Sequence, residues 1–170
     1  MIQILAYVII GLVVLGLLNV VVSIYNRLVM LNNNVDKSFV NIDVLLKQRA
    51  DEIPNLIKVV KESMRFEESL LTKLTDLRTQ YLNATSAEEK VELSNQMQTQ
   101  LKSIFAVAEN YPDIKTSQSF LSLQSRVSQI EDAIADRREF YNESVTMYNI
   151  GIEEFPNLIL AKIMMYNKKQ

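Results

Sequence analysis

The residue types that most often carry out chemistry in helical proteins are absent from this sequence or stand in unsuitable patterns. It contains no histidine and no cysteine, which excludes Glu-x-x-His iron ligands, the usual zinc ligands and a histidine-activated or cysteine nucleophile. Neighbouring glutamates occur at 67–68, 88–89 and 153–154, but adjacent side chains diverge on a helix. There is no glycine-rich phosphate loop. The sequence therefore predicts a protein that is not an enzyme, with no cofactor, metal or small-molecule substrate.

A second group of polar side chains flanks the apolar positions of the expected helices. Buried polar groups need partners, so they either form ion pairs and hydrogen bonds that fix helix register or line a groove for a partner protein. We favour the structural interpretation. The candidate structural network comprises Arg49, Asp51, Arg137, Arg138 and Asn142, with Asn41, Asp43, Arg78 and Glu131 nearby.

Two further features are candidate interaction sites. Tyr141 and Tyr148, each followed by asparagine, are seven residues apart and share a helix face; packing is expected, and a binding surface is the alternative. Residues 157–170 form an amphipathic tail that is too short to span a bilayer. The tail either inserts into a neighbouring subunit, caps its own bundle or lies on the inner leaflet. The candidate assembly residues are Tyr141, Tyr148, Leu158, Ile159, Ile163, Met164 and Tyr166.

The elements that position these residues begin with an apolar run at 2–24. At about 1.5 Å per residue it is roughly 34 Å long, enough for a hydrocarbon core of about 30 Å. A secretory signal has a basic start, a shorter apolar core and a small-residue cleavage site, and the run at 2–24 shows none of these three features. We expect residues 1–26 to be a retained transmembrane anchor, the alternatives being a signal peptide or a buried core helix. The anchor positions are Ile2, Leu5, Val8, Leu12, Leu15, Leu18 and Val22.

The charges predict the orientation of that anchor. All 18 lysines and arginines follow the run, with Arg27 and Lys37 nearest to it. Basic residues stay on the cytoplasmic side, so the N-terminus is expected outside and the remainder in the cytoplasm. A net charge of −2 without a basic stripe predicts that nucleic acid is not a partner.

Beyond the anchor, apolar residues recur at steps of three and four, and glycine occurs once, at Gly151. This texture predicts an all-α fold in which the transmembrane helix is followed by an antiparallel four-helix bundle of long helices in 27–156. Pro54 is expected to start the second helix, a Ser86–Glu89 capping box the third and Pro112 the fourth, with Pro156 ending it. The second helix is expected to bury Ile57, Val60, Met64, Leu71, Leu74 and Tyr81.

Several motifs follow one another along the chain. They include Tyr25-Asn26-Arg27-Leu28-Val29, Arg49-Ala50-Asp51-Glu52-Ile53-Pro54-Asn55-Leu56, Tyr111-Pro112-Asp113-Ile114-Lys115 and Phe155-Pro156-Asn157. In this order they resemble the landmarks of the bacterial LemA family. The resemblance covers nearly the whole chain. It implies a single-pass protein of the bacterial inner membrane with a cytoplasmic four-helix domain, and it implies no reaction.

Together these features predict a non-enzymatic, membrane-anchored helical scaffold that self-assembles and organises or remodels membrane. The expected partners are the lipid bilayer and further copies of the chain. The alternative is a membrane-tethered adaptor or sensor that binds another protein through a groove in the bundle.

Overall fold

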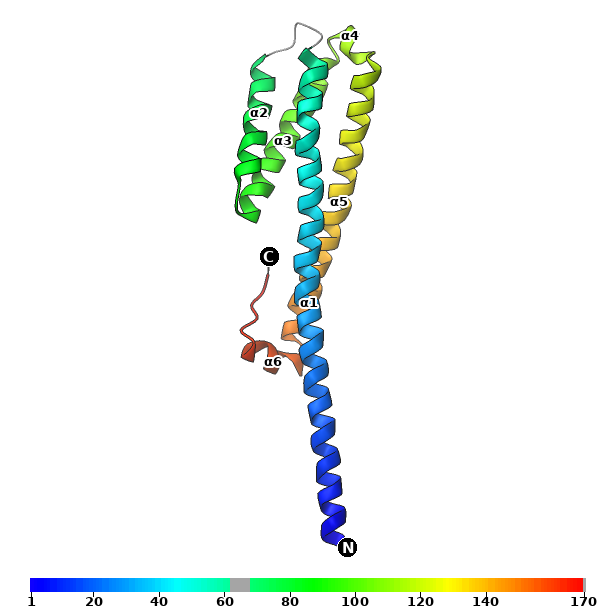
Figure 1. Cartoon of the computed structure of the whole chain (residues 1–170), viewed down its shortest axis with the longest axis vertical. Coiled ribbons are helices and arrows are strands. Elements are labelled where there is room, and N and C mark those ends of the chain that lie inside the picture. The colour runs from blue at the N-terminus through cyan, green and yellow to red at the C-terminus, as the bar shows by residue number, and fades with distance from the viewer. Residues whose placement is uncertain (62–67, 170) are drawn as a thin grey trace. The chain divides into compact units, whose positions relative to one another are not determined.

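The computed structural model describes residues 1–61 and 68–169, apart from the side chain of Ile2, and every regular element in these residues is a helix (Figure 1). The prediction of an all-α fold with a long apolar N-terminal helix is confirmed. The predicted core residue Met64 lies outside the described residues, as does Glu67. The helices are α1 (Ile2–Lys61), α2 (Glu68–Asn83), α3 (Ala87–Ala108), α4 (Pro112–Lys115), α5 (Gln118–Glu153) and α6 (Asn157–Ile163).

Pro54 lies inside α1 and does not begin a second helix, so the boundary predicted there is wrong. A proline within a helix leaves the carbonyl four residues earlier without its N–H donor, and here that carbonyl belongs to Ala50. The Nε of Arg78 replaces the missing donor and donates to the Ala50 carbonyl oxygen at 2.9 Å. The apolar stripe of α1 also continues past the proline through Leu56 and Val60, which are both fully buried.

Replacing Arg78 with methionine is therefore expected to lower the free energy of unfolding by about 1–3 kcal/mol, because a part-buried carbonyl loses its donor. In a Pro54→Ala background the alanine N–H supplies that donor, and the same substitution should cost less. Chemical denaturation of the parent chain, both single variants and the double variant measures this coupling. Equal costs of Arg78→Met in the two backgrounds would contradict the compensation.

The chain divides into two compact units, residues 1–41 with 137–170 and residues 42–136. We call them unit 1 and unit 2. In unit 2, four helical segments each bury one apolar stripe, as amphipathic helices must. These stripes include Ile42, Leu46, Ile53, Leu56 and Val60 of α1, Leu71, Leu74, Leu77 and Tyr81 of α2, Leu93, Met97, Leu101 and Ile104 of α3, and Phe120, Leu123, Val127, Ile130 and Ile134 of α5.

The predicted start of α3 is confirmed, whereas the predicted fourth helix is interrupted. The Ser86 hydroxyl accepts a hydrogen bond from the Glu89 N–H at 3.1 Å and caps α3. After Pro112 the chain makes only the short α4, which ends in a tight turn where the Ser117 N–H donates to the Ile114 carbonyl at 2.9 Å. Ile114 is buried inside that turn, and α5 begins beyond it.

Unit 1 is built around a cluster to which α1, α5 and α6 all contribute. Gly151 of α5 allows a close approach to α1, since a Cβ at this position would overlap the side chain of Leu31. The predicted break at Pro156 is confirmed, and α6 starts at Asn157. The buried Asn157 amide donates to the Gly151 carbonyl at 3.1 Å and to Glu154 at 2.8 Å, which fixes α6 to the end of α5. The cluster comprises Leu28, Val35, Val145, Tyr148, Ile152 and Ala161.

Candidate functional site

The N-terminal part of α1 is a helix that is long and apolar enough to cross a membrane. Its most apolar window has a mean hydropathy of 2.8, and none of that window is buried within the protein. The first fully buried side chain of α1 is Leu28, and Ile24 is partly buried against the unit 1 cluster. The anchor side chain of Ile2 lies outside the described residues. The anchor residues Leu5, Val8, Leu12, Leu15, Leu18 and Val22 are all exposed.

A buried arginine joins three helices of unit 2. Arg49 of α1 has no exposed surface and donates to the Ser94 carbonyl of α3 at 2.6 Å, to the Ser94 hydroxyl and to the Glu131 carboxylate of α5 at 2.5 Å. The other oxygen of Glu131 accepts a hydrogen bond from Gln98 at 2.6 Å. Within the described residues, the Arg49 Nε is a buried polar atom without a hydrogen-bond partner. A buried charge needs this degree of pairing, and removing either partner leaves the other uncompensated.

The remaining members of the predicted polar network lie elsewhere. Asp51 is more than half exposed and stands 4.0 Å from Arg78. The other three belong to unit 1, where Arg137 and Asn142 are exposed and Arg138 is half-buried.

Two members of the Arg49 network, Ser94 and Gln98, were missed by the sequence analysis. Ser94 directly follows the buried Leu93 and precedes the buried Met97 by three residues, so its place on the apolar stripe was the available signal. No comparable signal marks Gln98, because it is paired through Glu131 of a distant helix segment.

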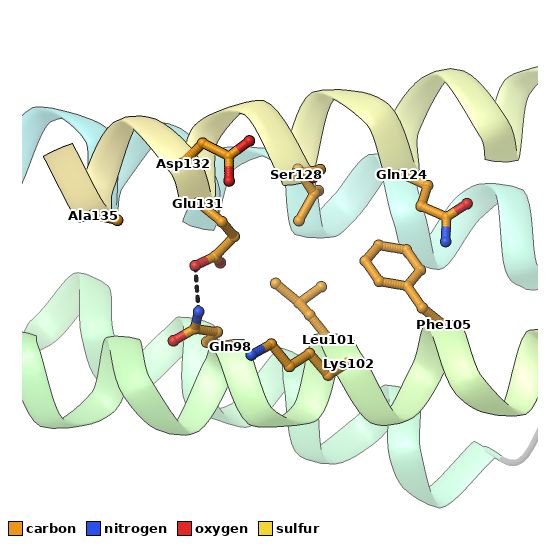
Figure 2. Close-up of a pocket in the computed structure, with 10 residues that line it drawn as sticks. Gln98, Leu101, Lys102, Phe105, Gln124, Ser128, Glu131, Asp132 and Ala135 are labelled. Atoms are coloured by element: carbon orange, nitrogen blue, oxygen red, sulfur yellow. Dashed lines mark hydrogen bonds between the residues drawn. The ribbon is translucent and has the colours of Figure 1, made fainter.

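Next to this network a groove of about 460 Å³ lies between α3 and α5 (Figure 2). Its walls combine apolar side chains with charged and amide groups, and Figure 2 shows Lys102 of α3 on the opposite wall from Glu131 and Asp132 of α5. The described residues contain no group of three or more potential metal-ligating side chains. The lining of the groove thus mixes apolar, amide and charged side chains. It is lined by Gln98, Leu101, Lys102, Phe105, Gln124, Val127, Ser128, Glu131, Asp132 and Ala135.

A second ionic cluster in unit 2 involves Asp43. Its carboxylate accepts hydrogen bonds from the Lys90 ammonium at 3.2 Å and from the Tyr81 hydroxyl at 3.4 Å. Burial raises the pKa of Tyr81 well above its usual value of 10, and the neighbouring Asp43 carboxylate raises it further.

This raised pKa predicts a loss of stability in alkaline solution. The unfolded chain releases the tyrosine proton near pH 10 while the folded chain retains it. The contribution of Tyr81 to the free energy of unfolding is therefore full below pH 10 and declines as pH rises above it. Tyr81→Phe removes the titrating group, and its free energy of unfolding should fall less between about pH 9 and about pH 11 than that of the parent. Denaturant titrations at the two pH values measure the difference, and parallel declines would show that Tyr81 does not contribute.

The two predicted tyrosines and the tail meet in unit 1. The Tyr141 ring lies edge-on to Phe39, with 6.0 Å between the ring centroids. Tyr148 is buried, and its ring centroid is 5.9 Å from that of Tyr166. The Lys169 ammonium lies 5.3 Å from the centroid of the Tyr148 ring. Both tyrosines therefore make packing contacts, and Tyr166 brings the tail against α5.

Polar contacts also hold the tail to unit 1. Lys169 exchanges two backbone hydrogen bonds with the Asn149 side chain, at 2.9 and 3.0 Å, and its ammonium pairs with Asp36 at 2.7 Å. Of the tail residues predicted to mediate assembly, Leu158 and Met164 are half-buried, while Ile159 and Ile163 are exposed. The tail thus packs on its own unit and keeps part of its apolar surface free of it.

Comparison with known proteins identifies similar chains. A model of the LemA family matches residues 38–170. Magnetosome protein MamQ 2 of Paramagnetospirillum magneticum is 25% identical over 192 residues, covering 94% of this chain and 71% of that protein. Magnetosome protein MamQ of Magnetospirillum gryphiswaldense is 21% identical, with 85% and 62% covered. Protein LemA of Metamycoplasma hominis is 26% identical over 144 residues, with 84% and 66% covered.

Proposed function

Since the chain belongs to the LemA family, as its motifs predicted, and carries an apolar helix that its own core leaves uncovered, we propose that it is a non-enzymatic, single-pass membrane-anchored helical scaffold. The observation that carries this proposal is the exposure of the apolar run. Leaving so much apolar surface in water is unfavourable, and the run has the length of a bilayer core. Several relatives are named as magnetosome proteins, which supports a role in organising a cellular structure.

The orientation follows from the charges beyond the anchor. Arg27 and Lys37 are the first basic residues after the apolar run, and basic residues next to a membrane helix stay in the cytoplasm. The N-terminus then lies on the outer side of the inner membrane of a bacterial cell, and residues 27–170 lie in the cytoplasm. In unit 2 the short connection between α2 and α3 makes them antiparallel neighbours, which supports the antiparallel four-helix bundle.

Self-assembly is supported by an apolar face in unit 1. Phe140, Met147 and Ile150 of α5 are 51%, 55% and 56% exposed, and their spacings of seven and three place them on one side of the helix. A groove of about 210 Å³ lies along the same side and is lined in part by Leu31 of α1. Copies anchored in one membrane are confined to a plane with their units side by side. A second copy would cover this face, and arrays of copies would organise or remodel the membrane beneath them.

Cysteine crosslinking in the membrane tests this face, because the chain has no cysteine of its own. Met147→Cys is expected to form disulfide-linked dimers under mild oxidation. Thr146→Cys, equally on the surface of α5 but one position away, should form far fewer. We expect light scattering of the parent chain in detergent to show species larger than the monomer, and Met147→Glu should reduce them. A parent chain that is only monomeric, or equal crosslinking at the two positions, would reject self-assembly through this face.

The groove between α3 and α5 supports the second candidate, an adaptor or sensor that binds another protein. Its mixture of apolar side chains with Lys102 and Asp132 suits a peptide. A photo-crosslinking residue at Ser128 distinguishes the candidates in cells. One discrete adduct with a different protein, abolished by Ala135→Trp, would favour the adaptor, and its absence would leave the scaffold.

A further inference from the structure

The corner between α5 and α6 exposes four large apolar side chains. Phe155, Ile159, Ile163 and Met165 are 81%, 57%, 71% and 83% exposed. Ile159 and Ile163 are four residues apart and therefore lie on one side of α6, while Ala161 on another side is buried in the unit 1 cluster. A short segment that holds itself to the protein by one side and presents large apolar residues on the other has the character of an interaction surface.

This corner lies at the level where the apolar run of α1 ends. Arg27, just beyond the run, pairs with Glu154 at the end of α5 at 2.8 Å. Ile24, the last residue of the run, packs against the same cluster that contains Ala161. In Figure 1, α6 lies beside α1 where the blue stretch leaves the other helices, and it extends across the direction of α1.

The chemistry of the corner matches the boundary between lipid and water. A helix that lies in the plane of a membrane surface buries its apolar side chains about 5–10 Å into the boundary between headgroups and acyl chains. Lys162 of α6 is exposed, as expected of a side chain that reaches anionic headgroups. Tyr25 on α1 is 48% exposed at the same level, and tyrosine is enriched at membrane interfaces.

We propose that Phe155, Ile159, Ile163 and Met165 form a second membrane contact, which inserts into the leaflet from which α1 emerges. The proposal rests on the anchor proposed above and adds a function for the tail. With only α1 in the bilayer, unit 1 would be free to tilt about one helix. With the α5–α6 corner inserted as well, unit 1 is held at two points and keeps a defined orientation to the membrane surface. The occupant of this surface is lipid, and the competing occupant is a second copy of the chain.

Site-specific fluorescence of the full chain in vesicles of phosphatidylethanolamine and phosphatidylglycerol tests the contact. Single-cysteine variants Ile159→Cys and Ile163→Cys carry a nitrobenzoxadiazole label, and nitroxide groups on the lipid acyl chains serve as quenchers. We expect blue-shifted emission and lipid quenching at both positions. Thr146→Cys, exposed on α5 of the same unit, is the matched control, and iodide in the water should quench its label several-fold more strongly.

Two results would overturn the proposal. Labels at 159 and 163 that iodide quenches as strongly as the label at 146 would show that the corner stays in water. Labels shielded from both iodide and lipid nitroxides would show that another copy covers it. Leu12→Cys, in the middle of the apolar run, separates these outcomes from a failure of the anchor itself. If the lipid nitroxides quench the label at position 12 but not the label at position 159, the second contact alone is rejected. If they quench neither label, the anchor is rejected as well.

Discussion

Arg49→Ala is expected to lower the free energy of unfolding by about 3–5 kcal/mol, the usual cost of removing one partner from a buried ion pair. The substitution removes the donors that join α1 to Ser94 of α3 and to Glu131 of α5. It leaves the Glu131 carboxylate, only 19% exposed, with Gln98 as its remaining donor. Denaturant unfolding of the full chain in detergent, followed by circular dichroism, measures the loss.

Two further variants make this result specific to the buried pair. Arg126→Ala breaks another arginine–glutamate pair between α5 and α1, in which Glu52 is only 12% exposed but the arginine is 55% exposed. Because water screens the Arg126 charge and the Asn55 amide still donates to Glu52, this substitution should cost less than Arg49→Ala. Replacing both partners, as in Arg49→Met with Glu131→Gln, removes the uncompensated charge and should cost less than Arg49→Ala. An Arg49→Ala variant no less stable than Arg126→Ala would show that the buried arginine does not hold the three helices together.

The second large effect concerns the anchor. Arginine at the centre of a membrane helix raises the free energy of insertion by about 2.5–3.5 kcal/mol, so Leu12→Arg combined with Leu15→Arg should prevent stable insertion. Both side chains are exposed on α1, in a stretch of which none is buried, so the helices that follow the apolar run should keep their fold. Fractionation of cells should find the parent chain with the membranes and the double variant largely outside them or degraded.

A charge-matched variant controls for this effect. Gln80→Arg combined with Thr146→Arg likewise adds two positive charges, at exposed positions of α2 and α5, and should remain with the membranes. If the anchor variant stays as firmly in the membrane fraction as this control, residues 2–24 are not what holds the chain there.

The sequence was sufficient to predict those helices and helix ends that are determined by residues close together in the chain. The apolar run and the Ser86 cap of α3 depend on neighbouring residues, and so does the start of α6 after Pro156. Pro54 shows where such prediction fails. A proline removes one hydrogen bond from a helix interior, and on that ground alone a helix boundary is predicted at this position. The donor that offsets this cost belongs to Arg78, 24 residues later and on another helix.

The buried Arg49 network was likewise only partly predictable from the sequence. A charged residue on the apolar stripe between Leu46 and Ile53 marks Arg49 as unusual from the sequence alone. Its partners Ser94 and Glu131 lie 45 and 82 residues away, so only the packed helices identify them. The tail is comparable: its amphipathic composition indicates an interaction, whereas the contact of Tyr166 with Tyr148 requires the folded unit.

The most direct test of membrane anchoring is peptide mapping of the chain that remains in cell membranes after alkaline carbonate extraction. We expect the chain in the pellet to retain residues 2–24, and only detergent to release it. A membrane-derived chain that begins after Ser23, or a chain that carbonate alone releases, would contradict the proposal that this helix is a permanent membrane span.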